Sequence, residues 1–83
     1  MEKLVLEIPG EILVSLKESP LEFSKSILML SAVKLYEMGK LSSGRAADLA
    51  GISRVRFLQS LSQYNVPIFD LSDEELKQDF NNA

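Results

Sequence analysis

The chain has 83 residues, of which 46% are hydrophobic and 25% charged, with a net charge of −3. This composition is typical of a folded domain rather than a disordered segment. It contains no Cys and no His, which excludes disulfides, thiolate or imidazole catalysis and nearly every zinc site. The longest apolar run, residues 27–33, is too short to span a bilayer, and the N-terminus lacks a signal-peptide pattern. We therefore expect a cytoplasmic protein with no membrane partner.

Charge is distributed unevenly along the chain. Residues 1–39 carry four Lys against six Glu, a balance of −2, and residues 64–83 carry one Lys against five acidic residues, a balance of −4. Residues 40–63 carry four basic side chains against one acidic side chain, a balance of +3. The middle of the chain is therefore the part suited to an anionic partner.

The N-terminal residues Leu4 to Ile8 lie in a segment that alternates apolar and polar side chains, the period of a β-strand with one buried face. Pro9 and Gly10 end this pattern. No other segment convincingly predicts a strand, and a lone strand has unpaired edges. A chain this short also buries only about 60–65% of the surface that it exposes when unfolded. We therefore predict that the strand pairs across a two-fold axis in a homodimer.

Two helices are predicted next. Residues 11–18 have apolar side chains at helical spacing and favour a short helix. A second helix is predicted over residues 20–38, where Ser19 and Glu22 have the spacing of a capping box and Gly39 follows as a left-handed C-terminal residue. Because apolar residues cover more than one face of this helix, we expect it to pack on its own chain and on a partner.

Residues 42–64 predict a helix-turn-helix. Ser42 can cap the first helix and Ser53 the second, after a very short turn. Two helices that cross closely need a small residue at the crossing and a residue that tolerates positive φ in the turn. Ala47 and Gly51 satisfy these two requirements.

The outer face of the second predicted helix is polar and carries no carboxylate. Arg, Gln and Ser are side chains that contact base edges and phosphates, so this face favours DNA binding. The predicted DNA-binding residues are Arg45, Ser53, Arg54, Arg56, Gln59, Ser60 and Gln63. The other interpretation, a helical hairpin that serves only as scaffold and has solvated arginines, stays open.

The last part of the chain, residues 65–83, predicts an extended apolar segment and then a short acidic helix. We expect residues 66–71 to close the protein's own core. Leu76 and Phe80 stand one helical turn apart, and two interpretations stay open for them: they clamp the last helix down, or they anchor in a groove of a partner protein. They are the predicted partner-binding residues.

The sequence thus predicts one mainly α domain over residues 1–83. Residues 1–39 would hold the strand, two helices and the dimer contact through the 4–8 strand and the 20–38 helix. Residues 40–64 would hold the helix-turn-helix, and residues 65–83 the extended segment and the short C-terminal helix. No Lys, Ser or carboxylate has an evident catalytic neighbour, so we expect no enzyme, no cofactor and no metal.

The stretch "LYEMGKLSSGRAADLAGISRVRF" begins a segment, Leu35 to Leu76, that resembles the small prokaryotic uncharacterised protein family 0175. Members share the Gly-Lys-Leu-Ser, Ala-Ala and Gly-x-Ser-Arg elements of this stretch, followed by a short Val-Pro or Ile-Pro segment and an acidic tail. The resemblance places Ser53, Arg54 and Phe57 on the helix-turn-helix core of the family. It implies no catalytic residues.

The resemblance also implies a function. Proteins of this kind are often encoded beside a PIN-domain ribonuclease and are regarded as its neutralising partner, in the manner of VapB-type antitoxins. We therefore expect a type II antitoxin that binds a PIN-domain toxin and its own promoter, at a palindromic site if the dimer presents two recognition helices. Two alternatives stay open: a transcriptional regulator without a toxin, and a protein-interaction module whose helix-turn-helix does not bind DNA.

Overall fold

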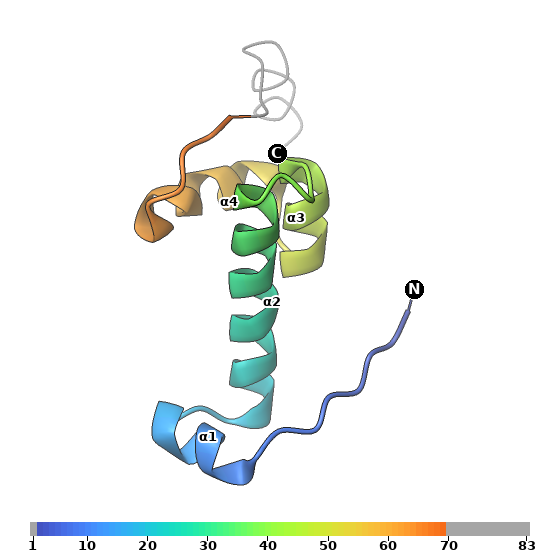
Figure 1. Ribbon diagram of the computed structural model, residues 1–83, viewed down its shortest axis with the longest axis vertical. Coiled ribbons are helices and arrows are strands. Elements are labelled where there is room, and N and C mark those ends of the chain that lie inside the picture. The colour runs from blue at the N-terminus through green and yellow to red at the C-terminus, as the bar shows by residue number, and fades with distance from the viewer. Residues whose placement is uncertain (1, 70–83) are drawn as a thin grey trace.

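The computed structural model describes residues 2–69 of the chain, and these contain four α-helices and one 3₁₀ helix. In chain order they are α1 (Gly10–Leu16), α2 (Pro20–Glu37), α3 (Ser43–Ala50), α4 (Arg54–Ser60) and the 3₁₀ helix η1 (Leu61–Tyr64). Helix α2 forms the long axis of the molecule (Figure 1). Helix α1 lies at one end of α2, and α3 and α4 lie at the other. The predicted C-terminal helix lies outside the described residues.

The predicted N-terminal strand is wrong. Residues 2–9, which we call the N-terminal arm, form neither helix nor strand, and no strand occurs anywhere in residues 2–69. Every residue of the arm is exposed, with Leu4 at 82% and Leu6 at 60%. Alternation favours a strand only where a second strand supplies hydrogen-bond partners for its backbone, and the described chain offers none.

Helix α2 begins as predicted, with both hydrogen bonds of a capping box. The Glu22 backbone N–H donates to Ser19 Oγ over 3.2 Å, and the Ser19 backbone N–H donates to Glu22 Oε1 over 2.9 Å. The bond from the Ser19 backbone is the main cause that lowers the pKa of the Glu22 carboxyl, ahead of the bond with the Ser19 hydroxyl. Gly39 has the predicted left-handed conformation after the helix, with φ of +75°.

The two helices of the predicted helix-turn-helix are confirmed as α3 and α4, which are joined by residues 51–53. Gly51 has φ of +75°, and the Ile52 N–H donates to the Ala47 carbonyl over 3.1 Å in a Schellman arrangement. Ser53 then caps α4, because its Oγ accepts from the Arg56 N–H over 3.2 Å. Local hydrogen bonds therefore fix both the end of α3 and the start of α4. From here on, α3, residues 51–53 and α4 are called the helix-turn-helix.

The core lies between the C-terminal half of α2 and the helix-turn-helix. Tyr36 and Phe57 are fully buried, and their rings meet edge to face with centroids 5.7 Å apart. Small residues let the helices approach closely here, because Ala46 and Ala47 are both buried on α3. The core cluster consists of Ala32, Val33, Tyr36, Ala46, Ala47, Phe57, Leu58, Leu61 and Val66.

The segment after η1 was predicted to close the core, and among its described residues 66–69 only Val66 is buried. Val66 is buried, and the Phe69 N–H donates to the Tyr36 hydroxyl over 3.0 Å while the Phe69 ring stacks on the Tyr36 ring. Ile68 and Phe69 are 51% and 53% exposed, so they do not close the core as predicted. The remaining residues of the predicted core-closing segment, Asp70 and Leu71, lie outside the described residues.

The other end of the molecule has no core of its own. Helix α1 buries none of its residues, and all the buried residues of α2 belong to its C-terminal half. Among residues 2–69, no helix is long and apolar enough to cross a membrane.

Candidate nucleic-acid interface

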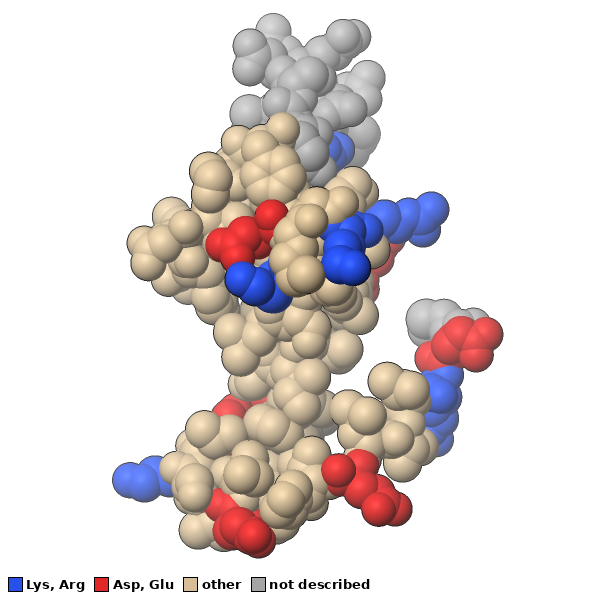
Figure 2. Space-filling model, in the orientation of Figure 1, with Lys and Arg blue, Asp and Glu red and all other residues tan. Residues whose placement is uncertain are grey.

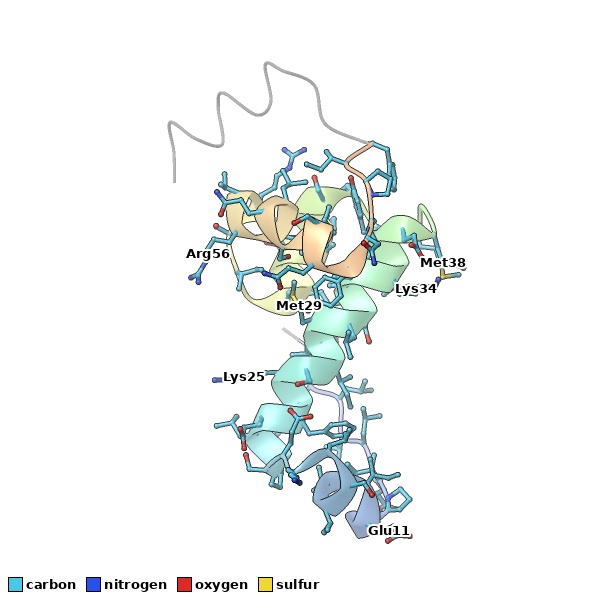
Figure 3. The ribbon with its side chains drawn as sticks, turned by 90° about the vertical axis from the view of Figure 1, so that its left-hand side faces the viewer. Glu11, Lys25, Met29, Lys34, Met38 and Arg56 are labelled. Atoms are coloured by element: carbon cyan, nitrogen blue, oxygen red, sulfur yellow. The ribbon has the colours of Figure 1, made fainter. Side chains whose placement is uncertain are left out.

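The outer face of α4 continues into η1 and presents long polar side chains. Arg56, Gln59 and Gln63 follow one another at spacings of three and four residues, which places them on one side, and all three are exposed. Figure 3 shows Arg56 projecting away from the body of the molecule. The opposite side of these helices is held in the core by Val55, Phe57, Leu58 and Leu61. Burial of that apolar side fixes which residues α4 presents outward.

Arg54 was predicted to lie on this open face, but it is turned partly into the motif. It is half-buried, and its Nε donates to Ser43 Oγ over 2.8 Å. Ser43 is 0% exposed, so this bond joins the first turn of α4 to the first turn of α3 from inside the helix-turn-helix. At least part of the hydrogen-bonding capacity of Arg54 is thus used to hold the two helices together.

The two predicted serines are also engaged locally. Ser53 is exposed but acts as the N-cap of α4, and Ser60 is half-buried and donates from Oγ to the Phe57 carbonyl over 2.7 Å. A serine that donates to its own helix has less capacity to donate to a phosphate or a base. Arg56, Gln59 and Gln63 therefore form the more available part of the predicted set.

Arg45 extends the basic surface onto α3. Its side chain is exposed, while its backbone N–H donates to the capping oxygen of Ser42 over 3.3 Å. Figure 2 shows Lys and Arg side chains projecting from the half of the molecule that holds α3 and α4, although acidic side chains are visible there as well. One of the acidic residues of this half is Asp48, which is exposed on α3. The surface is therefore mixed in sign, and its exposed arginines are Arg45 and Arg56.

Ser43 is a residue of the site that the sequence interpretation missed, since that interpretation assigned only Ser42, as a cap. A signal for it exists in the helical spacing. Ser43 precedes Ala46, Ala47 and Ala50 by three, four and seven residues, the positions of the inner face of α3. A polar residue on an inner face needs a hydrogen-bond partner, and an Arg eleven residues further along supplies it.

The predicted partner-binding residues Leu76 and Phe80 lie outside the described residues. The predicted dimer surface, residues 4–8 and the 20–38 helix, is described. Residues 4–8 are exposed, whereas α2 buries Ala32, Val33 and Tyr36 in the core, so these three positions of α2 are not part of a dimer contact.

Comparisons with known proteins are consistent with one another. Over 81 residues the chain is 36% identical to a UPF0175 protein of Aeropyrum pernix, an alignment that covers 98% of this chain and 85% of the relative. Over 77 residues it is 39% identical to a UPF0175 protein of Archaeoglobus fulgidus, covering 92% and 84%. No solved structure matches the chain. The family match extends over residues 1–83, and the chain thus belongs to the uncharacterised protein family UPF0175.

Proposed function

We propose that this protein binds duplex DNA through the outer face of α4 and regulates its own operon. The observation that carries the proposal is the exposed row of Arg56 and Gln59 on α4 and Gln63 on the following η1, at the second helix of a helix-turn-helix whose inner side is fixed in a core. In proteins with this motif the second helix enters the major groove and its N-terminal residues contact base edges. Arg56 lies in the first turn of α4 and would contact guanine, and Gln59 would contact adenine.

Arg45 and Arg54 have different roles in this proposal. Arg45 is exposed at the N-terminal part of α3, where a phosphate is its natural counterpart. Arg54 is a positioning residue, because its bond to Ser43 sets how α4 lies on α3. Phosphate contacts orient a protein on the duplex, whereas base contacts give sequence specificity.

The proposal includes a second activity, the neutralisation of a PIN-domain ribonuclease by direct binding, which would make the protein a type II antitoxin. Its support is the resemblance of residues 35–76 to a family of antitoxin-like proteins. The DNA-binding part stands without it, because a regulator that has no toxin would use the same α4 surface.

One alternative has a specific observation in its favour. The Arg54–Ser43 bond commits polar groups to the inside of the motif, and the Ser60 hydroxyl is bonded within its own helix, as expected for a helix-turn-helix that serves as scaffold. In that case the protein would act only by binding another protein, and Arg56, Gln59 and Gln63 would be solvated surface residues.

Fluorescence anisotropy with duplex DNA from upstream of the gene, measured across a salt series, separates these functions. The test variant is Arg56→Ala, and Lys25→Ala is the matched control, because each removes one exposed positive charge and Lys25 projects from the N-terminal half of α2 (Figure 3). The proposal predicts that Arg56→Ala weakens binding about tenfold or more and flattens the slope of log K against log salt by about 1, whereas Lys25→Ala has little effect.

Arg54→Ala is a poor test, since it also removes the bond to Ser43. If the wild type fails to bind either the upstream DNA or a random duplex at low salt, the DNA-binding function is wrong and the scaffold alternative is favoured. Equal losses in Arg56→Ala and Lys25→Ala would indicate non-specific attraction without a role for α4.

A further inference from the structure

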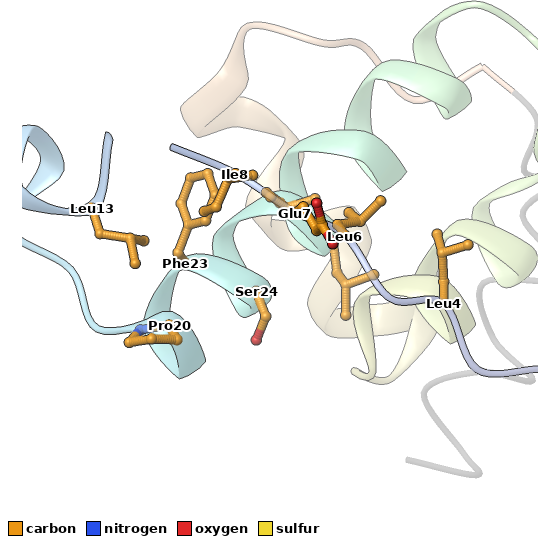
Figure 4. Close-up of a pocket in the computed structure, with 10 residues that line it drawn as sticks. Leu4, Leu6, Glu7, Ile8, Leu13, Pro20, Phe23 and Ser24 are labelled. Carbon is orange, nitrogen blue, oxygen red and sulfur yellow. The ribbon is translucent and has the colours of Figure 1, made fainter. Parts of the chain in front are cut away.

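An apolar groove of about 740 Å³ lies between the arm and the N-terminal half of α2. The arm forms one side of the groove and α2 the other, and Figure 4 shows Phe23 of α2 pointing toward Ile8 of the arm. The main apolar side chains that line it are Leu4, Leu6, Ile8, Phe23, Ile27 and Leu28.

This surface is apolar and open to solvent. Leu4 and Leu6 are largely exposed, and Leu28 is 41% exposed on α2. Helix α1, which flanks the groove through Leu13, is seven residues long and buries none of them. A helix this short is not stable by itself in water, and a contiguous exposed apolar surface of this kind marks an interaction site. The end of the molecule that holds the arm therefore needs a cover.

We infer that the cover is a second copy of this chain, with the two arms side by side and antiparallel about a two-fold axis at Val5. The sequence of the arm is complementary to itself in this arrangement. Lys3 lies opposite the partner's Glu7, and Leu4 lies opposite the partner's Leu6. Because the axis is two-fold, each of these contacts occurs twice.

The charges argue for a second copy over an unrelated protein. Among arm residues 2–9, Lys3 is the one basic side chain. It stands two residues before Val5, and the acidic Glu7 stands two residues after it. A parallel arrangement in the same register would put Lys3 beside another Lys3, so opposite charges select the antiparallel one. The inference concerns contacts between the side chains of the two arms, and residues 2–9 form no strand in the single copy.

The arm runs back from α1 beside α2, and α3 and α4 lie at the end of α2 remote from α1 (Figure 1). The inference is independent of the proposed DNA binding: a dimer forms in this way whether or not α4 meets DNA.

Charge exchange tests the inference in analytical ultracentrifugation at low salt. Lys3→Glu puts like charges at both arm contacts, and so does Glu7→Lys, so each variant alone should weaken self-association by on the order of tenfold. The double variant Lys3→Glu, Glu7→Lys restores opposite charges and should recover the wild-type dissociation constant. Lys40→Glu, an exposed residue near α3, is the control that should leave it unchanged.

Mixing the two single variants gives the sharpest result. One chain then carries only acidic groups at positions 3 and 7 and the other only basic groups, so both contacts are attractive in the mixed pair. We expect the mixture to form heterodimers more tightly than either variant forms homodimers. A monomeric wild type at about 100 μM would overturn the inference, and so would a dimer that is indifferent to these charges or a double variant that fails to recover.

Discussion

Arg54 Nε donates to Ser43 Oγ over 2.8 Å, and this bond joins the two helices of the helix-turn-helix at their first turns. Ser43 is fully buried, whereas Arg54 is half-buried at the start of the helix that we propose for DNA binding. Hydrogen bonds to a charged donor contribute more than neutral ones, particularly where water is excluded. The orientation of α4 on α3 therefore depends on a polar contact as well as on apolar packing.

Replacing Ser43 by Ala should destabilise the fold. The change removes the acceptor of the Arg54 bond at a fully buried position, so we expect a loss of about 1–3 kcal/mol in the free energy of unfolding. Urea unfolding followed by circular dichroism measures it. The control is Ser62→Ala, at an exposed position, which should change stability by less than about 0.5 kcal/mol. Equal stability of the two variants would show that the bond contributes nothing.

Gly51→Ala should lower the stability of the fold for a conformational reason alone. Gly51 has φ of +75°, while a Cβ built there would meet no atom within 4 Å. A left-handed residue with a side chain costs roughly 1–2 kcal/mol, which should appear as a lower urea midpoint. Gly10→Ala is the matched control, because its Cβ also meets nothing and its φ is not positive. A Gly51→Ala protein as stable as Gly10→Ala would contradict the assigned turn.

Tyr36→Phe should loosen the segment that follows η1. The substitution keeps the buried ring but removes the hydroxyl that accepts from the Phe69 N–H. A hydrogen bond worth about 1 kcal/mol corresponds to roughly fivefold faster amide exchange at Phe69. Tyr64→Phe, at a half-buried position on η1, should leave that rate unchanged. Unaltered exchange at Phe69 in Tyr36→Phe would rule out this contact as the anchor of the segment.

The capping box of α2 should make stability depend on pH in a defined direction. The pKa of Glu22 is lowered from 4.5 in the folded protein, so the charged carboxylate stabilises the cap above pH 4.5. This contribution is lost as the pH falls from 4.5 through the lowered pKa. Wild type should thus exceed Glu22→Gln in urea midpoint at pH 7, and the difference should shrink by pH 3.

Ser19→Ala distinguishes the charge of the carboxylate from the rest of the cap. The bond from the Glu22 N–H to Ser19 Oγ joins neutral groups, so its loss persists at low pH. Ser19→Ala should therefore stay less stable than wild type at pH 3. At that pH, in contrast, the stability of Glu22→Gln should approach that of wild type. A constant difference between wild type and Glu22→Gln from pH 7 to pH 3 would contradict the role given to the carboxylate.

The sequence predicts the elements whose signals are local. Ser19 with Glu22, and Gly51 before Ser53, act within one helical turn, so short-range chemistry alone determines the start of α2 and the turn between α3 and α4. The arm is different, because a strand depends on a partner that alternation does not specify. Helical periodicity also did not distinguish Arg54 from Arg56. They lie two residues apart on α4, yet Arg54 is tied to Ser43 from another helix, a long-range contact that spacing within one helix does not reveal.

The most direct test of the central claim is to map the DNA-contacting residues. Amide chemical shifts of isotope-labelled protein, recorded while upstream duplex DNA is added at low salt, report each residue separately. We expect the largest changes in Ser53 to Gln63 and around Arg45, with little change in arm residues 2–9 and α1. Changes confined to the arm, or no changes at all, would contradict α4 as the DNA-binding surface.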